Sequence, residues 1–480
     1  MLVDKNSNIP LYIQLYNNIK KMIEKNELKE GEKLPSIRSL SKKLNVNNIT
    51  IVNAYKMLEK EGYVFSIKGS GTYVKPENYD DNYIENNKDI KLMAEGVLSI
   101  SKESINFASV SPTPELFPIE EFKQSLMEVL DRDKGNAFVY PEINGYEPFR
   151  KSISSFLNKS YNMDVDKDQI VIISGGQQGI DIIAKILVSP GDYIFVENPT
   201  YSAAIASFKS RGAKIIGIPI LEDGIDVNML DEYAKKYKPK FLYMMTNFQS
   251  PTTYSYSEEK KKELLYLSEK HNFYIIEDDF LTDLHYHDNK KFPLKSIDSS
   301  DKVIYIKSFS KIFMPGLRIG FMTVPKDLFT SIIKAKHISD ISSSGFLQRA
   351  FDMYLRKGYW EKHIETIKNV YTNKYNIMIS ELEKLKKYNI SFYEPKGGLS
   401  IWIKLPKEIE STYLYNECIK DNVAIVPGKI FFVDDSIYSN YIRLSFGDVT
   451  NDEIVDGIRV IENNLKKKYS PNSNKYIPFI

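Results

Sequence analysis

The stretch Ser308-Phe309-Ser310-Lys311, which continues to Pro315-Gly316-Leu317-Arg318-Ile319-Gly320, places a lysine amine and a guanidinium at fixed spacing after an apolar run. That run, residues 303–306, predicts a buried strand, and burial beside it favours the neutral form of the lysine. Only a neutral amine attacks an aldehyde to form a Schiff base. The two serine hydroxyls and the guanidinium are suited to bind a phosphate. An ordinary strand followed by a polar surface loop is the alternative.

On both sides of this stretch, apolar runs alternate with helical patterns from residue 105 onward, as in a parallel α/β sheet. Ligand sites in such sheets gather at the carboxyl ends of the strands. We therefore expect the site among the residues that follow each run. The predicted strands are residues 169–173, 193–197, 214–218, 241–245, 273–277 and 303–306.

Two of these strand ends carry groups suited to the same site. The turn Ser174-Gly175-Gly176-Gln177 opens a helix, where backbone N–H groups can bind a phosphate, although a plain strand-to-helix turn is the alternative. Asp278 ends another strand thirty-three residues before Lys311. A carboxylate there can keep a pyridine nitrogen protonated. The neighbouring Asp279 is the second candidate for this role, and strand capping is the alternative for both.

Together these motifs resemble the fold-type I aminotransferases that use pyridoxal 5'-phosphate (PLP), over about residues 105–463. The resemblance implies that Lys311 holds PLP as an aldimine, with Lys311 and Asp278 as the catalytic pair. It also implies that Tyr201 stacks on the ring, and that Arg443 binds the carboxylate of an amino acid. Tyr140 matches a position that reaches the phosphate from a partner subunit, so a homodimer is expected. The cofactor site implied in this way is Gly175, Gly176, Gln177, Tyr201, Asp278, Ser308, Ser310, Lys311, Arg318 and Tyr140.

The sequence departs from this family at two places. Aminotransferases commonly carry Asn-Pro-Thr-Gly, whose Asn bonds the ring hydroxyl, where this chain has Ser250-Pro251-Thr252-Thr253. A Tyr that usually helps the same oxygen is replaced by Phe280. Loss of both donors is expected to slow transamination without preventing PLP binding.

The N-terminal residues predict a separate small domain. Residues 10–25 have helical apolar spacing, a second helix begins after Pro35-Ser36, and a third begins near Asn47 and ends at Gly62. Residues 63–67 and 72–74 then predict a β-hairpin. Two short helices joined by a tight turn, followed by a hairpin, are typical of a winged helix-turn-helix.

This domain resembles the winged helix of GntR-type regulators, which implies binding to double-stranded DNA. By that resemblance Arg38 contacts a phosphate or base edge, Asn47, Asn48 and Thr50 face the major groove, and Lys68 and Gly69 contact the adjoining backbone. Many relatives have Arg where Asn48 stands, and Asn prefers adenine, so an operator rich in A and T is expected. Asn47 and Thr50 could instead serve only as helix caps.

Composition is consistent with this division. Residues 1–76 carry thirteen Lys and Arg against seven Asp and Glu, whereas residues 77–90 carry five acids and one Lys. We expect a DNA-binding domain over 1–76, an acidic linker over 77–103 with a short helix near 90–100, and an aminotransferase-like domain over 104–480. One cysteine, five histidines and no long apolar run predict no disulfide, no metal site, no membrane segment and a cytoplasmic protein.

A GntR-type winged helix fused to an aminotransferase-like domain is the arrangement of the MocR group of regulators. The sequence therefore predicts a regulator that senses PLP or an amine effector, with a winged helix (α+β) joined to an α/β PLP-dependent transferase domain of fold type I and a small C-terminal α+β subdomain. Weak or half-transamination remains compatible with that function. An active aminotransferase with a DNA-localising head is the main alternative, and a purely structural large domain is a third.

Overall fold

The protein is described by a computed structural model, which covers residues 7, 10–25, 27–28, 32–44, 46–67, 71–74, 104–286, 290–434 and 440–468. The chain separates into two compact units. The linker predicted over 77–103, its short helix, Lys68 and Gly69 lie outside the described residues.

The first unit contains the winged helix. It consists of α1 (Leu11–Glu24), α2 (Ile37–Leu44), α3 (Asn48–Lys60), β1 (Val64–Ile67) and β2 (Gly71–Val74). The two strands pair in antiparallel register, with Val64 opposite Val74. The Ser36 hydroxyl accepts from the Ser39 N–H at 3.2 Å at the start of α2. The predicted order of three helices and a hairpin is therefore present.

A small core holds the three helices and the hairpin together. Leu15 and Ile19 of α1 are fully buried against Leu58 of α3, with Leu40 of α2 also in the cluster. The Tyr55 hydroxyl of α3 donates to the Pro35 carbonyl at 2.8 Å, which fixes α3 against the start of α2. These contacts fix the position of the first turn of α3 relative to α1 and α2.

The second unit is built on a mixed sheet, which has eight strands among the described residues in the order β4-β11-β10-β9-β8-β5-β6-β7. Strands β8, β9 and β10 are parallel, β5 is parallel to β8, and β11 is antiparallel to both of its neighbours. All predicted strands are present, and β11 and β7 were not predicted. The strands are β4 (Ile170–Ile173), β5 (Tyr193–Asn198), β6 (Lys214–Leu221), β7 (Gly224–Ile225), β8 (Phe241–Met244), β9 (Tyr274–Asp279), β10 (Val303–Ser308) and β11 (Gly320–Thr323).

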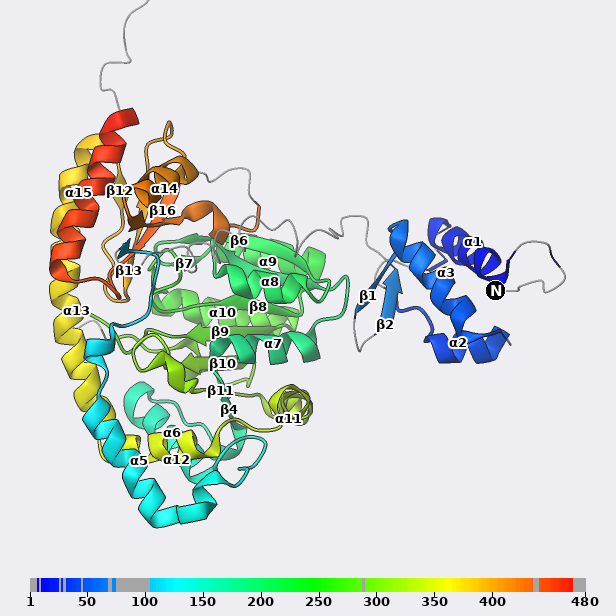
Figure 1. Ribbon diagram of the computed structural model, residues 1–480, viewed down its shortest axis with the longest axis horizontal. Coiled ribbons are helices and arrows are strands. Elements are labelled where there is room, and N and C mark those ends of the chain that lie inside the picture. The colour runs from blue at the N-terminus through cyan, green and yellow to red at the C-terminus, as the bar shows by residue number, and fades with distance from the viewer. Residues whose placement is uncertain are drawn as a thin grey trace, which may run out of the picture. The chain divides into compact units, whose positions relative to one another are not determined.

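Helices surround this sheet (Figure 1). Strands buried on both faces, such as β8 and β10, read as continuous apolar runs because helices cover both sides. The helices are α5 (Ile119–Asp133), α6 (Glu147–Tyr161), α7 (Gly176–Leu187), α8 (Ser202–Lys209), α9 (Val227–Tyr237), α10 (Glu258–His271), α11 (Lys326–Asp340), α12 (Gly345–Arg356), α13 (Tyr359–Glu383), α14 (Ser411–Lys420) and α15 (Asn451–Lys468).

A smaller subdomain follows, with one antiparallel sheet of order β12-β13-β16-β15. Its strands are β12 (Ser391–Phe392), β13 (Ser400–Lys404), β15 (Val426–Pro427) and β16 (Tyr441–Ser445), and a separate pair joins β3 (Ile105–Asn106) to β14 (Val423–Ala424). Figure 1 shows α13 and α15 running side by side along this part of the molecule.

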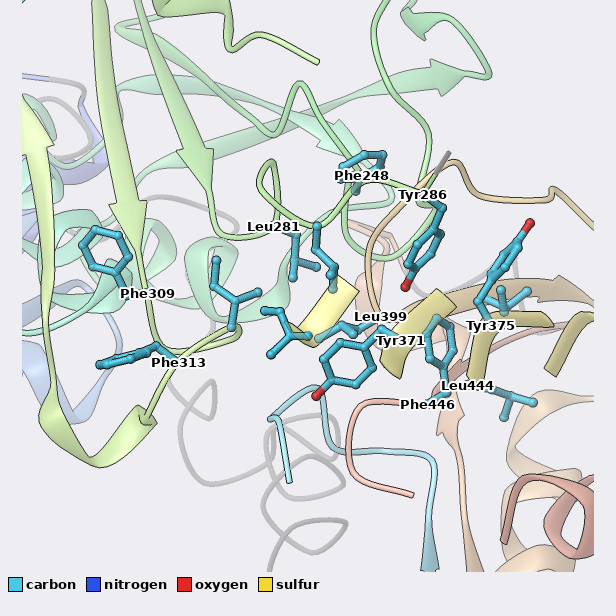
Figure 2. Close-up of a cluster of buried hydrophobic side chains, with 14 of the residues drawn as sticks. Phe248, Leu281, Tyr286, Phe309, Phe313, Tyr371, Tyr375, Leu399, Leu444 and Phe446 are labelled. Carbon is cyan, nitrogen blue, oxygen red and sulfur yellow. The ribbon is translucent and has the colours of Figure 1, made fainter. Parts of the chain in front are cut away.

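One continuous apolar core joins the small subdomain to the large sheet. Figure 2 shows Phe309 and Phe313, which flank the lysine stretch, on one side, and Leu399, Leu444 and Phe446 of the small subdomain on the other. The chain neighbours of Arg443 on β16 and those of Lys311 therefore belong to the same apolar core.

Two features of the described residues bear on other classes of function. No described helix is both long and apolar enough to cross a membrane. Within the same residues, no group of three or more His, Cys, Asp or Glu side chains is placed to hold a metal ion.

Candidate functional site

The lysine loop is anchored by the apolar residues on both sides of Lys311. Phe309, Ile312 and Phe313 are each at most 2 % exposed within the core. Lys311 itself forms no ion pair with any residue that the structure describes. Burial, and then the positive charges of Arg443 and Arg318, lower the pKa of Lys311 from 10.5 to about 8. A lysine with this pKa is partly neutral near pH 7, as attack on an aldehyde requires.

The glycine turn lies directly against Arg318. Gly175 has φ +94°, and a Cβ placed there would be 2.7 Å from Arg318 Nη2. The same guanidinium nitrogen donates to the Ser174 carbonyl at 2.5 Å. The Ser310 hydroxyl oxygen is buried and has no hydrogen-bond partner among the described residues. The turn and the guanidinium are thus adjacent, and both groups, like the Ser310 hydroxyl, are of a kind that binds a phosphate.

Asp278 and Asp279 end β9 in different surroundings. The Tyr243 hydroxyl donates to Asp278 Oδ2 at 2.6 Å, and a Cβ at Gly176 would lie 3.6 Å from Asp278 Oδ1. Asp278 therefore faces the glycine turn. Asp279 instead accepts from the Tyr305 hydroxyl at 2.6 Å and pairs with Lys307 Nζ at 3.1 Å. Its other oxygen caps the turn after β9. Geometry thus favours Asp278 over Asp279 as the group beside a ring nitrogen.

Burial governs the charge of Asp278. Loss of hydration raises its pKa to about 6, while the Tyr243 hydrogen bond lowers the pKa and the charge of Asp279 raises it. The carboxyl group is thus mainly ionised at pH 7. A protonated ring nitrogen would stabilise the ionised form further.

Arg443 is a nearly buried cation on β16, 8 % exposed. One Nη donates to the Ala108 carbonyl at 2.5 Å, and the guanidinium carbon lies 5.4 Å from the centre of the Phe431 ring. Its Nε has no hydrogen-bond partner among the described residues. Burial lowers the pKa of Arg443 to about 10, so it stays charged at pH 7. Such a cation is costly unless an anion reaches it.

Tyr201 lies close enough to Asp278, Arg443 and Arg318 for their charges to change its pKa. Burial and the charge of Asp278 raise the pKa of the Tyr201 phenol, whereas Arg443 and Arg318 lower it. The phenol therefore lies within electrostatic range of three predicted site residues. The structure brings together Ser310, Lys311, Arg318, Asp278, Tyr201 and Arg443.

Three other predicted residues are Gln177, Tyr140 and Ser308. The side chain of Gln177 donates to the Ser207 hydroxyl at 2.8 Å, so any contact with a phosphate would come from its backbone. Tyr140 is 79 % exposed, as a residue offered to a partner subunit would be. Ser308 is 8 % exposed, and its hydroxyl accepts from the Ser310 N–H at 3.4 Å.

The two departures are also visible. Phe280 packs against the main core, and the carbonyl of the neighbouring Gln249 side chain, rather than Ser250, accepts two hydrogen bonds from Thr252. Sequence reasoning overlooked Asn247, which follows β8. It is buried and its side-chain oxygen has no hydrogen-bond partner among the described residues. A polar residue three positions after the end of an apolar strand was the available signal.

In the winged helix, the first turn of α3 presents three predicted residues and one that was not predicted. Asn47 caps α3 by accepting from the Ile49 N–H at 3.0 Å, which is the capping role left open above. Asn48 is exposed and Thr50 half-buried, and Thr50 does not cap the helix. Ile49, between them, is 64 % exposed, which is unusual for a large apolar side chain. The Arg38 side chain is outside the described part.

Known families match the two units. Residues 103–461 match aminotransferase class I and II, which is most of the chain. The chain belongs to the class I and II aminotransferase family. Residues 11–74 match the bacterial regulatory proteins of the gntR family, so this aminotransferase-family chain also carries a GntR DNA-binding domain.

Individual relatives of this aminotransferase-family chain share one or both units. The uncharacterised HTH-type transcriptional regulator YdfD of Bacillus subtilis is 28% identical over 95% of this chain and 96% of its own length. The probable rhizopine catabolism regulatory protein MocR of Rhizobium meliloti is 24% identical over 89% and 88%. The crystal structure of Pyrococcus horikoshii kynurenine aminotransferase in complex with PMP has a TM-score of 0.75 and 32% identity, covering 80% of this chain and 95% of that one.

The fold class predicted from the sequence is confirmed, and the fusion is that of a MocR-type, HTH-type transcriptional regulator. PLP is the cofactor of this aminotransferase-family domain. The residues fit it. The unpartnered Ser310 hydroxyl, the Gly175 turn that a Cβ would fill, and the carboxylate of Asp278 are suited to a phosphate and a pyridine nitrogen.

Proposed function

We propose that this regulator senses an amine effector, or PLP itself, in a site where Lys311 holds PLP covalently. The GntR domain supplies DNA binding, and the aminotransferase-family domain supplies the sensor. The PLP ring, when bound, withdraws electrons from an amine attached to its aldehyde carbon. The side chains of the protein bind the cofactor and the effector, orient them and hold or release protons.

The observation that carries this proposal is the uncompensated charge of Arg443. A guanidinium that is 8 % exposed and has an unpartnered Nε is suited to a bidentate bond with a carboxylate. Neither Lys311 nor Arg443 has an acidic partner among the described residues. An amino acid has both a carboxylate for Arg443 and an amine that competes for the position of the Lys311 amine.

Each side chain then has a separate task. Arg318 and the Ser174–Gly176 turn hold the phosphate, Tyr201 covers the ring, and Asp278 keeps the ring nitrogen protonated. Because the pKa of Lys311 is near 8, its Nζ can both accept and release a proton near neutral pH. The lysine amine can therefore give up its bond to PLP and form it again.

Regulation would follow from a dimer whose two winged helices take different spacings with and without effector. The exposed Tyr140 supports a partner contact at the phosphate. An effector can shift such an equilibrium only by its difference in affinity for the two arrangements. Asn48 on the first turn of α3 would contact bases of an operator.

An active aminotransferase with a DNA-localising head is the second candidate, favoured by the lowered pKa of Lys311 and by the likeness to kynurenine aminotransferase. Ser250 and Phe280 weigh against it, since neither supplies the expected donor to the ring oxygen. A turnover assay with an amino acid and an amino-group acceptor separates the two. A competent enzyme gives multiple turnovers, whereas a sensor does not.

The test compares Lys311→Ala with Arg443→Gln in an operator-binding assay. Lys311→Ala should lose the absorbance band of lysine-bound PLP and the effector response, yet bind the operator as the unliganded wild type does. Arg443→Gln should keep the band and lose the response to an amino acid. A Lys311→Ala protein that still responds would refute the proposed mechanism.

A further inference from the structure

Tyr243 is a buried tyrosine on β8 that no step above uses. It is fully buried, and its hydroxyl donates to Asp278 Oδ2 at 2.6 Å. The register pairs Tyr243 with Ile276, which lies two residues before Asp278 on the same face of β9. The tyrosine therefore reaches along the sheet face toward the carboxylate.

The two oxygens of Asp278 have different surroundings as a result. Oδ2 is occupied by Tyr243, whereas Oδ1 lies toward Gly176 at the start of α7. Asp278 is 8 % exposed, so a rotation of its carboxylate would break a hydrogen bond in a nearly dry environment. This arrangement fixes which oxygen is left for the cofactor.

We infer that Tyr243 is a positioning residue, which orients the Asp278 carboxylate and keeps it ionised toward the ring nitrogen of PLP. Tyr243 does not contact the reacting atoms in this scheme and acts only through Asp278. A hydrogen bond to a charged acceptor contributes more than one to a neutral acceptor. A donor at this place therefore favours the carboxylate over the neutral acid.

The other charged and titratable groups around Asp278 do not replace this donor. Asp279 raises the cost of the negative charge of Asp278, whereas burial raises the pKa of Glu197 of β5 to about 8, so Glu197 is mainly neutral at pH 7. Tyr201 lies within electrostatic range of Asp278. Lys307 of β10 is engaged with Asp279 and Asp283 at 3.1 and 2.8 Å. In the described part of the chain, Tyr243 is thus the one side chain that donates a hydrogen bond to Asp278.

A matched control lies on the loop that precedes α10. Tyr256 is also buried, and its hydroxyl donates to another buried carboxyl group, Glu197, at 2.7 Å. Phe substitution at either tyrosine removes one hydroxyl donor from one buried acid. Only the Tyr243 change removes a hydrogen bond from Asp278 itself.

The experiment measures PLP affinity of the full chain by absorbance titration, without DNA or effector, at pH 6 and pH 8. Tyr243→Phe should raise the Kd for PLP by about tenfold or more. The loss should be larger at pH 6, because without the Tyr243 donor the pKa of Asp278 rises and more of its carboxyl group is protonated at that pH. Tyr256→Phe should change the Kd by less than about twofold. In an Asp278→Asn background, Tyr243→Phe should have no further effect.

Three outcomes would overturn the inference. They are a wild-type Kd in Tyr243→Phe, an equal loss in Tyr256→Phe, or the same loss with and without the Asp278 carboxylate. A melting temperature recorded for each variant identifies unfolding. If Tyr243→Phe does not fold, Tyr243→Leu, which likewise has no donor, is measured instead, and an unchanged Kd or a failure to fold there also counts against the inference. This inference rests on PLP binding and not on sensing, so it survives a protein that fails to respond to effectors.

Discussion

The lowered pKa of Lys311 predicts how fast the protein combines with PLP at each pH. A lysine with a pKa of about 8, instead of 10.5, is neutral in roughly one molecule in ten at pH 7, against about one in three thousand. The rate of PLP capture by the PLP-free protein should therefore rise about tenfold per pH unit up to pH 7.5 and level off above pH 8. Stopped-flow absorbance between pH 6 and pH 10 measures this rate.

The same shift has a defined sign in stability. Between pH 8 and pH 10.5 the unfolded lysine still holds a proton that the folded one has released, so the free energy of unfolding of the PLP-free protein rises with pH in that window. The shift of 10.5 to about 8 corresponds to about 3 kcal/mol. Denaturant unfolding of the wild type and of Lys311→Met, which removes the charge, gives this contribution as a difference.

The reasoning has a clear point of failure. Burial is the largest cause of the shift and the charge of Arg443 comes next, so Arg443→Gln should move the midpoint of the rate profile to higher pH without restoring 10.5. A wild-type capture rate that keeps climbing to pH 10 would show that Lys311 is not desolvated. A Lys311→Met protein with the same pH dependence of stability would refute the assignment to this residue.

Two further predictions follow from the glycine turn and from α3. Gly175→Ala should weaken PLP binding at least tenfold, because the new Cβ meets Arg318 Nη2 at 2.7 Å on a backbone with φ +94°. Gly316→Ala, whose new Cβ has no neighbour within 4 Å among the described residues, should leave PLP binding unchanged. Equal Kd values for PLP in the two variants would contradict this prediction. The exposed Ile49 should contact the methyl group of a thymine in the operator. Replacing that thymine by deoxyuridine should weaken binding of the wild type a few-fold in fluorescence anisotropy, and should not change binding of Ile49→Ala. A selected operator with no such thymine would rule the contact out.

The sequence predicted the secondary structure well wherever a local residue pattern is typical of one kind of element. Apolar runs predicted β4, β5, β6, β8, β9 and β10 to within a few residues, because strands that are buried on both faces, such as β4 and β8, are mostly apolar. The strand β11 was missed. It is a run of only four residues that begins two positions after Arg318, and its antiparallel place depends on pairing with β10 and with the distant β4.

The site was predictable as a set of positions but not as a set of contacts. Strand ends indicated Lys311, Arg318 and Asp278, since parallel strands bring their carboxyl ends to one edge. The sequence left Asp279 open as a rival to Asp278. The choice depends on Tyr243 and Lys307, from two other strands, and no local pattern specifies these pairings. Ile49 was overlooked because an apolar residue in a helix is ordinarily expected to be buried.

The alternation along β9 has a consequence for how this chain tolerates insertions. Asp278 is paired with Ile306 and Asp279 with Lys307, so consecutive carboxylates project to opposite faces of the sheet. A slip by one residue would exchange them, leaving Lys307 buried without its partner and removing Asp278 from Tyr243. One added or deleted residue in β9 should thus abolish folding and cofactor binding together, whereas added residues in the α10–β9 turn leave this register free to persist.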